Sequence, residues 1–516
     1  MLLFTVLAAF AVRADTAAAG GSFMYGSDDS YIEMAVARHL ATGGVWGVTP
    51  YEFSGGSTTL AWPIVLAAVR RVAGAHDAAG FVLNVLCALL LLGAANLVLE
   101  RHVRGAWLRA LCLCAIVVGA SLSALALMGM EHSLQSLAAL VFAAATLRAS
   151  ADPPSRRRFV AAMIVAAAVM MSARFDTGAV LVPVVIWWLS KREWRIAAAV
   201  TAAAALPVAL YALVATAHGW PALPASVLLL SRLSDAGTST LRDLVDLAGY
   251  GGLAMLLGTP VFMALTFAAL ALLAFGLRGD RSEGARECRL LLWIFLAAEV
   301  VHFQGSRSGE PYLFRYEAYL VPLGIVAAGA ALGHVLEARR VDRWSIEWWA
   351  TAAIGIVLLQ PLVQRGVRME RVVVDGARAI SREEYQLGRL FGGRPWPAAV
   401  VFRDVLGSTY WADLRVVDLD GLANADVTEA LRQGPLDAAA TDRLARAHGA
   451  RYAVIAYPAT DIPESWIRVA DWADEGRPLF AFYALDPAAA EELGAALAGY
   501  DARLPAGIVR IEGGSG

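Results

Sequence analysis

Long hydrophobic runs recur along the first part of the chain and predict membrane-spanning helices. A helix needs about 20 apolar residues to cross the hydrocarbon core of a bilayer. The pattern therefore predicts an α-helical polytopic membrane domain over residues 1–364 with about 11 spans. The runs fall at roughly 1–12, 80–99, 107–128, 132–147, 159–172, 177–190, 196–217, 250–277, 289–304, 317–337 and 346–363.

The run at 1–12 is short and has no basic flank. We interpret it as a first span, although a cleaved signal peptide also fits a short apolar stretch that precedes small residues. A start site assigned too late is a third interpretation.

Basic residues orient the predicted spans. Cytoplasmic loops carry an excess of Lys and Arg. When residues 13–79 are placed outside, every inner loop contains at least three basic residues, as in the group Arg101, Arg104 and Arg109. The outer segments are longer and hold fewer. This predicts an inner (plasma) membrane protein whose C-terminal part is extracytoplasmic.

The segment 57–73 looks like another span, but a crossing there would invert every later loop. We therefore expect it to lie along the outer membrane surface, with Arg70 and Arg71 reaching toward lipid headgroups. Helices on the outer face are accordingly expected at about 29–73.

Hydropathy falls after Gln364, and short apolar strands then alternate with amphipathic helices. This pattern predicts a small soluble α/β domain over residues 365–516. The expected strands are 399–402, 415–418, 452–456, 479–484 and 508–511, and the expected helices are 438–448 and 487–499.

Composition supports this organisation and excludes several function classes. Hydrophobic residues make up 58% of the chain and charged residues 17%, and the mean hydropathy is +0.57. The net charge of −2 does not indicate a nucleic-acid partner. A glycine-rich phosphate loop is missing from the sequence, which argues against an ATP-driven pump.

Adjacent carboxylates stand just outside the first predicted span, in the segment Ser27-Asp28-Asp29-Ser30-Tyr31. Such a pair can bind a divalent cation such as Mg²⁺ or Mn²⁺, or one carboxylate can act as a base whose pKa the other raises. The simpler interpretation is an Asp that caps the N-terminus of a helix.

Other ionisable residues also fall on the predicted outer side, where they are candidates for function. Each has an ordinary explanation as well, namely helix capping, a local ion pair or a structural histidine. What distinguishes the group is that its members share one side of the membrane. They are Glu131, His132, Arg174, Asp176, His302, Arg315 and Tyr316.

The order of these motifs resembles the GT-C superfamily of integral membrane glycosyltransferases, in particular the bacterial branch that uses polyprenyl-phosphate sugars and includes mycobacterial arabinofuranosyltransferases. Residues 54–62 resemble its Gly-x-Thr-x-x-Leu-Trp surface helix, and residues 417–422 its Asp-Leu-x-Gly-Leu element. The other matching segments are Asp28-Asp29-Ser30-Tyr31, Gly129-Met130-Glu131, Arg174-Phe175-Asp176-Thr177-Gly178, and Arg315-Tyr316 before Val321-Pro322-Leu323.

One family element is missing. Members often carry Pro-Asn-Thr/Ser-x-x-x-Lys in the long outer loop, whereas residues 224–230 here contain neither Asn nor Lys. If that element grips the donor phosphate, Arg232 is the candidate substitute.

The resemblance implies transfer of a sugar from a polyprenyl-phosphate donor to a cell-envelope glycan or lipid acceptor on the outer face. Asp28 or Asp29 would be the base, the other would orient the acceptor or hold a metal, and Glu131 would assist. Arg174 and Arg315 would bind the phosphate. The remaining candidate donor or acceptor contacts are Tyr31, His132, Asp176, Arg232, His302 and Tyr316.

Two alternatives belong to other function classes. A lipid or sugar transporter would need charged residues along a path through the membrane, and the sequence suggests almost none there. A non-catalytic envelope assembly protein would use the soluble domain to bind a partner. The sequence identifies neither the sugar nor the acceptor.

Overall fold

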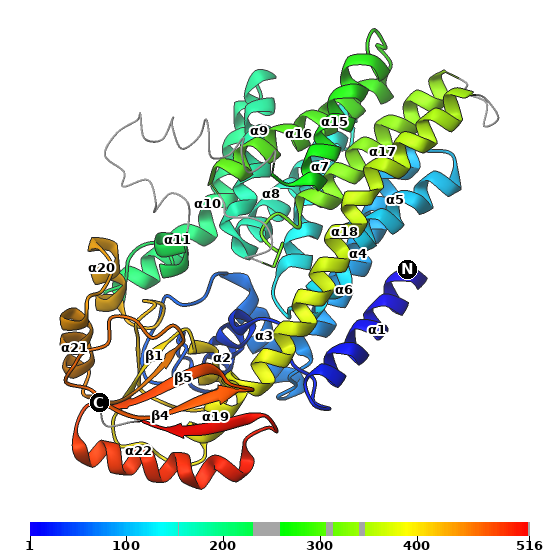
Figure 1. The fold of residues 1–516 in the computed structure, drawn as a ribbon. Helices are drawn as coiled ribbons and strands as arrows, with labels where there is room; N and C mark the ends of the chain where they lie inside the picture. Colours follow the sequence, from blue (N-terminus) through cyan, green and yellow to red (C-terminus); the bar gives the residue numbers. More distant parts are fainter. Residues whose placement is uncertain (153, 231–257, 306–312, 340–345, 514–516) are drawn as a thin grey trace.

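The computed structural model describes residues 1–152, 154–230, 258–305, 313–339 and 346–513. Figure 1 shows a bundle of long helices at one end of the molecule and a sheet with flanking helices at the other. Short helices from the N-terminal part of the chain lie between them.

The helices of the bundle correspond to the predicted hydrophobic runs. Five of those described, α4, α7, α10, α16 and α17, are long and apolar enough to cross a membrane. The predicted total of about 11 spans stays a prediction. The bundle helices are α1 (Leu2–Ala18), α4 (Ala79–His102), α5 (Ala106–Gly119), α6 (Leu122–Leu127), α7 (His132–Ala151), α8 (Arg156–Ala173), α9 (Gly178–Ser190), α10 (Trp194–Ala217), α15 (Pro260–Ala271) with the π-helical turn η3 (Leu272–Gly276), α16 (Glu283–Gly305), α17 (Leu320–Ala338) and α18 (Ile346–Arg382).

The run at 107–128 is not one continuous helix. It is divided into α5 and α6 by Ser121, whose φ of 48° is left-handed. Helix α18 supplies partners for the interrupted turn, because Arg365 Nη1 donates to the carbonyl of Gly119 at 2.6 Å and Ser121 Oγ donates to Glu370 at 3.2 Å. A hydropathy average could not detect this break.

The expectation of almost no buried charge among the bundle helices is wrong. Glu299 of α16 is buried and accepts a hydrogen bond from Thr266 of α15 at 2.6 Å. Glu317 and Arg365 are also buried, with 3.8 Å between their charged groups. Polar partners on neighbouring helices make this burial tolerable.

Two helices between the bundle and the sheet domain follow α1 in the chain. They are α2 (Asp28–Gly43) and α3 (Ala61–Ala73), which pack on each other. Helix α3 has 13 residues, about 20 Å of length, and is therefore short for a crossing. The structure contains a helix where the surface helix was predicted, although it begins at residue 61 and not at 57.

The C-terminal domain is built on a six-stranded mixed sheet in the order β2-β1-β3-β5-β4-β6. Strand β1 is parallel to β2 and β3, and the remaining pairs are antiparallel. All five predicted strands are present, and α19, α20 and β4 were missed. The elements are α19 (Glu384–Gly392), β1 (Ala399–Arg403), β2 (Val416–Asp418), α20 (Ala425–Gln433), α21 (Ala438–Ala447), β3 (Ala450–Ala456), β4 (Ile467–Asp474), β5 (Arg477–Ala484), α22 (Pro487–Tyr500) and β6 (Ile508–Glu512).

Helix α18 joins the two parts. It continues past residue 364 to Arg382, whose guanidinium pairs with Asp474 at the end of β4. A second junction is aromatic: the Tyr31 ring of α2 lies 4.4 Å from Trp411 and 5.7 Å from Tyr410, measured between ring centroids. The sheet domain is therefore held against α2 and the end of α18.

Candidate active site

The N-terminus of α2 places the predicted Asp pair. Ser27 occupies the N-cap position, and Asp28 and Asp29 form the first turn, where the helix dipole favours negative charge. Neither aspartate is therefore the N-cap residue. The Ser27 hydroxyl donates to Asp28 at 3.3 Å instead of capping the helix.

Arg315 meets this turn from the segment before α17. Its guanidinium forms an ion pair with Asp29 and donates to Ser27 Oγ at 3.1 Å. The same guanidinium contacts Met130 Sδ at 3.3 Å and the Tyr316 hydroxyl at 3.4 Å. With 9% of its side chain exposed, Arg315 is a largely dehydrated cation, and Asp29 is the carboxylate that pairs with it in the described part of the chain.

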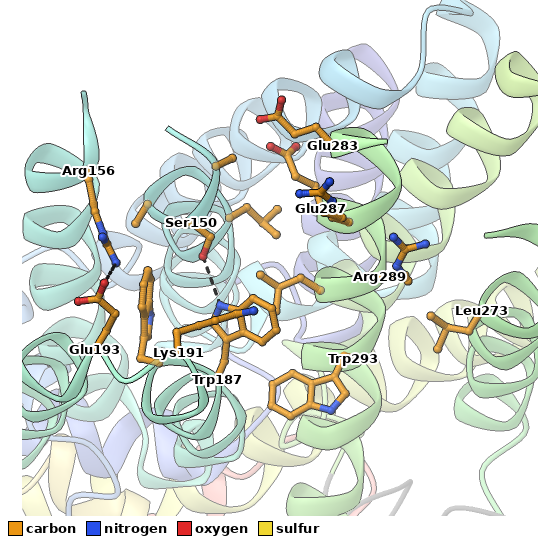
Figure 2. Close-up of a pocket in the computed structure, with 16 residues that line it drawn as sticks. Ser150, Arg156, Trp187, Lys191, Glu193, Leu273, Glu283, Glu287, Arg289 and Trp293 are labelled. Atoms are coloured by element: carbon orange, nitrogen blue, oxygen red, sulfur yellow. Dashed lines mark hydrogen bonds and ion pairs between the residues drawn. The ribbon is translucent and has the colours of Figure 1, made fainter. Parts of the chain in front are cut away.

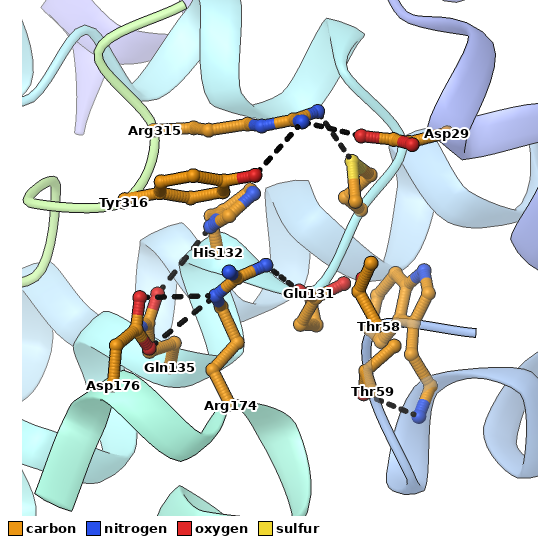
Figure 3. A network of polar contacts seen from close by, with 12 residues as sticks. Asp29, Thr58, Thr59, Glu131, His132, Gln135, Arg174, Asp176, Arg315 and Tyr316 are labelled. Atoms are coloured by element: carbon orange, nitrogen blue, oxygen red, sulfur yellow. Dashed lines mark hydrogen bonds and ion pairs between the residues drawn. The ribbon is translucent and has the colours of Figure 1, made fainter. Parts of the chain in front are cut away.

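A second guanidinium lies beside the first. Arg174 Nη1 is 3.0 Å from Glu131 Oε1, and Arg174 Nε is 3.3 Å from Asp176. Gln135 donates to Asp176 at 2.9 Å, and its amide oxygen lies 3.3 Å from His132 Nδ1. Figure 3 shows this group directly below Arg315 and Asp29.

The Tyr316 ring connects the two arginines. The guanidinium carbons of Arg174 and Arg315 lie 4.5 Å and 5.1 Å from its centroid. Both guanidiniums lie against one aromatic ring, which attracts cations, and each presents several N–H donors. Groups with several acceptor oxygens, such as a phosphate, match these donors.

Of the other predicted site residues, some lie near this network and others lie away from it. His302 of α16 contacts Tyr319 at 3.0 Å, and the Tyr319 hydroxyl donates to the backbone carbonyl of Asp176 at 3.1 Å, so His302 lies one residue away from the network. Tyr31 is buried in the aromatic junction, and its hydroxyl accepts from the Tyr25 amide at 2.9 Å. Arg232 lies outside the described residues.

Glu33 is a buried carboxylate that sequence reasoning missed. It accepts hydrogen bonds from Ser57 Oγ at 2.7 Å and from the Thr58 amide at 2.8 Å. Burial, and then the charge of Glu131, raise its pKa. Its position four residues after Asp29 on the same helix was the available signal, because residues i and i+4 share one face.

Glu384 also escaped the sequence analysis. It is 7% exposed, and its Oε2 has no hydrogen-bond partner in the described part of the chain. Only glycine fits opposite it, since a Cβ on Gly407 would stand 2.1 Å from that oxygen. Burial, followed by the charges of Asp28 and other carboxylates, raises the Glu384 pKa well above its usual value. No local sequence signal distinguishes this residue.

A cavity of about 320 Å³ brings Asp28, Arg315 and Glu384 to one space. It lies between the start of α2, helices α18 and α19, and the segment before α17. Asp28 is exposed to this space, yet protein surrounds it closely. This partial dehydration and the charge of Asp29 raise the Asp28 pKa to about 6.

The donor set at the Asp pair does not fit a resident metal ion. Asp29 is already paired with Arg315, and a guanidinium next to the carboxylates disfavours a divalent cation. Within the described ranges, no group of three or more His, Cys, Asp or Glu side chains is arranged to hold a metal. We therefore derive no step through a metal.

Comparison with known proteins identifies the fold. No protein-family model matches the chain, and no curated protein matches it. Among solved structures, the chain is similar to ArnT from Cupriavidus metallidurans bound to undecaprenyl phosphate, with a TM-score of 0.56 and 16% identity over 93% of this chain and 97% of that one. The apo state of the same protein gives 0.52 and 15% over the same shares.

A mycobacterial arabinofuranosyltransferase, AftD, gives a TM-score of 0.49 at 16% identity, over 94% of this chain and 41% of that longer one. The ArnT matches span nearly the whole of both chains and show that this multi-pass membrane protein has the GT-C fold. The predicted fold resemblance is thus confirmed.

Proposed function

We propose that this chain, which has the GT-C fold, is a glycosyltransferase that moves a sugar from a polyprenyl-phosphate donor to a cell-envelope glycan or lipid. One observation carries the proposal: a carboxylate with a raised pKa, Asp28, and a dehydrated guanidinium, Arg315, line one cavity beside the sheet domain. ArnT, whose fold it shares, was solved with undecaprenyl phosphate bound.

In the proposed reaction, the Asp28 carboxylate accepts the proton of an acceptor hydroxyl while that oxygen forms a bond to the anomeric carbon of the donor sugar. The bond from that carbon to the phosphate oxygen breaks, and polyprenyl phosphate leaves with the electron pair. Arg315 stabilises the charge that develops on the phosphate, and Arg174 adds a second cation nearby.

Asp28 suits the role of base better than Asp29 does. The Asp28 carboxyl faces the cavity, whereas Asp29 is occupied by Arg315. With a pKa of about 6, Asp28 is ionised at neutral pH and is still basic enough to accept a proton. Asp29 then positions Arg315.

The direct test supplies purified protein with a panel of radiolabelled polyprenyl-phosphate sugars and membrane acceptors. The proposal expects a labelled glycoside together with free polyprenyl phosphate. In sealed vesicles, label that crosses the bilayer on an intact donor would instead indicate the transporter alternative, for which buried groups such as Glu299 would be candidates.

The Glu384→Gln variant is expected to keep most of its activity just above pH 6 and to lose the decline in activity that we expect for the wild type at higher pH. A raised pKa keeps Glu384 neutral, and Gln imitates a neutral carboxyl. Ionisation at higher pH would place a third negative charge beside Asp28 and Asp29 and repel the donor phosphate. The measurement is kcat/KM against pH.

For comparison, Glu384→Ala should lose roughly 10-fold at every pH, because deleting this largely buried side chain leaves an unfilled space beside Asp28. Glu491→Gln, an exposed change on α22, should match the wild type. An inactive Glu384→Gln enzyme would mean that Glu384 works as a charged group, contrary to this prediction.

Membrane orientation is testable with single cysteines. In a background in which the accessible Cys87 and Cys114 are replaced by Ala, a cysteine at Ala439 in α21 should react with an impermeant thiol reagent in intact cells. A cysteine at Arg157, at the start of α8, should react only after lysis. The reverse pattern at either position contradicts an extracytoplasmic sheet domain.

A further inference from the structure

A large cavity lies at the end of the bundle opposite to the candidate active site. Its volume is about 1020 Å³, at the upper end of the range of about 300–1000 Å³ typical of small-molecule sites. The lining comes from the end of α7, the start of α8, the end of α9 and the start of α16. The opposite ends of these helices carry His132, Arg174 and His302.

The cavity has a surplus of positive charge. Among the lining residues, Arg156 is neutralised by Glu193 at 2.6 Å. The lining carboxylate Glu287 is paired at 3.1 Å with Arg101, which lies outside the lining. Lys191, Arg286 and Arg289 also line it.

The first two of these cations, Lys191 and Arg286, have no carboxylate within ion-pair distance among the residues that the structure describes. Arg289 donates to backbone carbonyls, those of Leu277 at 3.0 Å and Asp280 at 2.7 Å, and so keeps its full charge. Against these three cations, the one lining carboxylate that remains is Glu283.

Aromatic and apolar groups form the rest of the lining. Lys191 Nζ lies 4.3 Å from the centroid of the Trp187 ring, and the rings of Trp187 and Trp293 are 6.4 Å apart. Figure 2 shows these side chains around the cavity, with Leu273 on the far side. Tryptophan is enriched where a membrane meets water, because its ring is apolar and its N–H is polar.

We infer that this cavity binds the headgroup of an anionic phospholipid of the adjacent leaflet, with the phosphate near Lys191 and Arg286 and the glycerol region against the tryptophans. Cations at a membrane surface attract anionic lipids. Free phosphate would use the cations but would gain nothing from the tryptophan and leucine walls. The inference rests on the membrane domain and is independent of the proposed transfer reaction.

The test titrates the full-length protein in detergent with fluorescent phosphatidylglycerol, with phosphatidylcholine of the same acyl chains, and with inorganic phosphate as competitor. We expect tighter binding of phosphatidylglycerol than of phosphatidylcholine. The Lys191→Gln/Arg286→Gln variant should raise the phosphatidylglycerol dissociation constant about 30-fold, since each cation near an anionic lipid contributes about a factor of five. Both residues are exposed, so folding should be unaffected.

The matched control is Arg157→Gln/Arg158→Gln, which removes the same charge from exposed positions at the same end of the bundle, outside the lining. It should bind like the wild type, and Lys191→Arg/Arg286→Lys should stay within about threefold because charge is retained. Equal affinity for both lipids, equal losses in test and control variants, or full displacement by inorganic phosphate would each overturn the inference.

Discussion

Asp28→Asn is expected to lower the rate of sugar transfer at least about 100-fold, the lower range for loss of a general base. Asn keeps the size of the side chain and serves a helix terminus almost as well as Asp, but it cannot accept the proton. The raised pKa makes a further prediction: wild-type activity should fall as the pH drops through about 6 and Asp28 becomes protonated, and it should level off at the higher pH where Asp28 is fully ionised. The measurements are kcat and its dependence on pH.

Asp29→Asn should also lose about 100-fold or more, for a different reason, because Arg315 would lose its ion pair and its orientation. Protein levels should change little in either variant. Glu52→Gln, an exposed change in the segment between α2 and α3, is the control and should be fully active. Wild-type activity in both Asn variants would remove the pair from the mechanism and leave Glu131 as the next candidate base.

Arg315→Gln is expected to lower kcat/KM roughly 100- to 1000-fold, the scale observed when one donor to a developing negative charge is removed. The loss should exceed that of Arg315→Lys, which keeps the charge but not the geometry that lets one guanidinium reach both a carboxylate and a phosphate. Most of the effect should appear in kcat, because the charge on the phosphate oxygen grows as the bond breaks.

Removing Arg315 leaves Asp29 without its partner, so a loss of activity needs a check on folding. The double variant Arg315→Gln/Asp29→Asn restores charge balance and should elute and melt like the wild type while remaining inactive. Arg432→Gln, which breaks an exposed ion pair on α20, should have no effect on transfer. Normal kcat and donor KM in Arg315→Gln would contradict the proposed phosphate contact.

Helices and strands were largely predictable, because their signals are local. An apolar run of sufficient length forms a helix in lipid whatever lies elsewhere, and a short run of β-branched and aromatic residues is enough for a strand such as Ala399–Arg403. The features that the sequence analysis missed depend on contacts with neighbouring elements and not on the local sequence. The break at Ser121 depends on polar groups of α18, and β4 interleaves its buried residues with charged ones such as Arg468 and Asp471.

Several residues of the candidate site could be predicted from the sequence, but most of their contacts could not. Ionisable residues on the outer side stand out against an apolar background, which is how Asp29, Glu131, Arg174 and Arg315 were found. The pair of Arg174 with Asp176 is local, but the longer-range pairs were not visible: Asp29 lies 286 positions from Arg315, and Glu131 lies 43 positions from Arg174. Which carboxylate meets which guanidinium is set by how α2, α7, α8 and α17 pack.

The sequence by itself thus determined the division into a membrane bundle and a sheet domain, and the side on which charged groups gather, because length, hydropathy and loop charge act locally. Only the tertiary structure showed that Asp28 faces a cavity while Asp29 is taken up by Arg315. Only the structure added Glu384 from the sheet domain, since its environment comes from Asp28 and Gly407, which are remote in sequence. Burial and charge at a site are properties of the packed chain, and they are the reason why we propose Asp28, among several carboxylates, as the base.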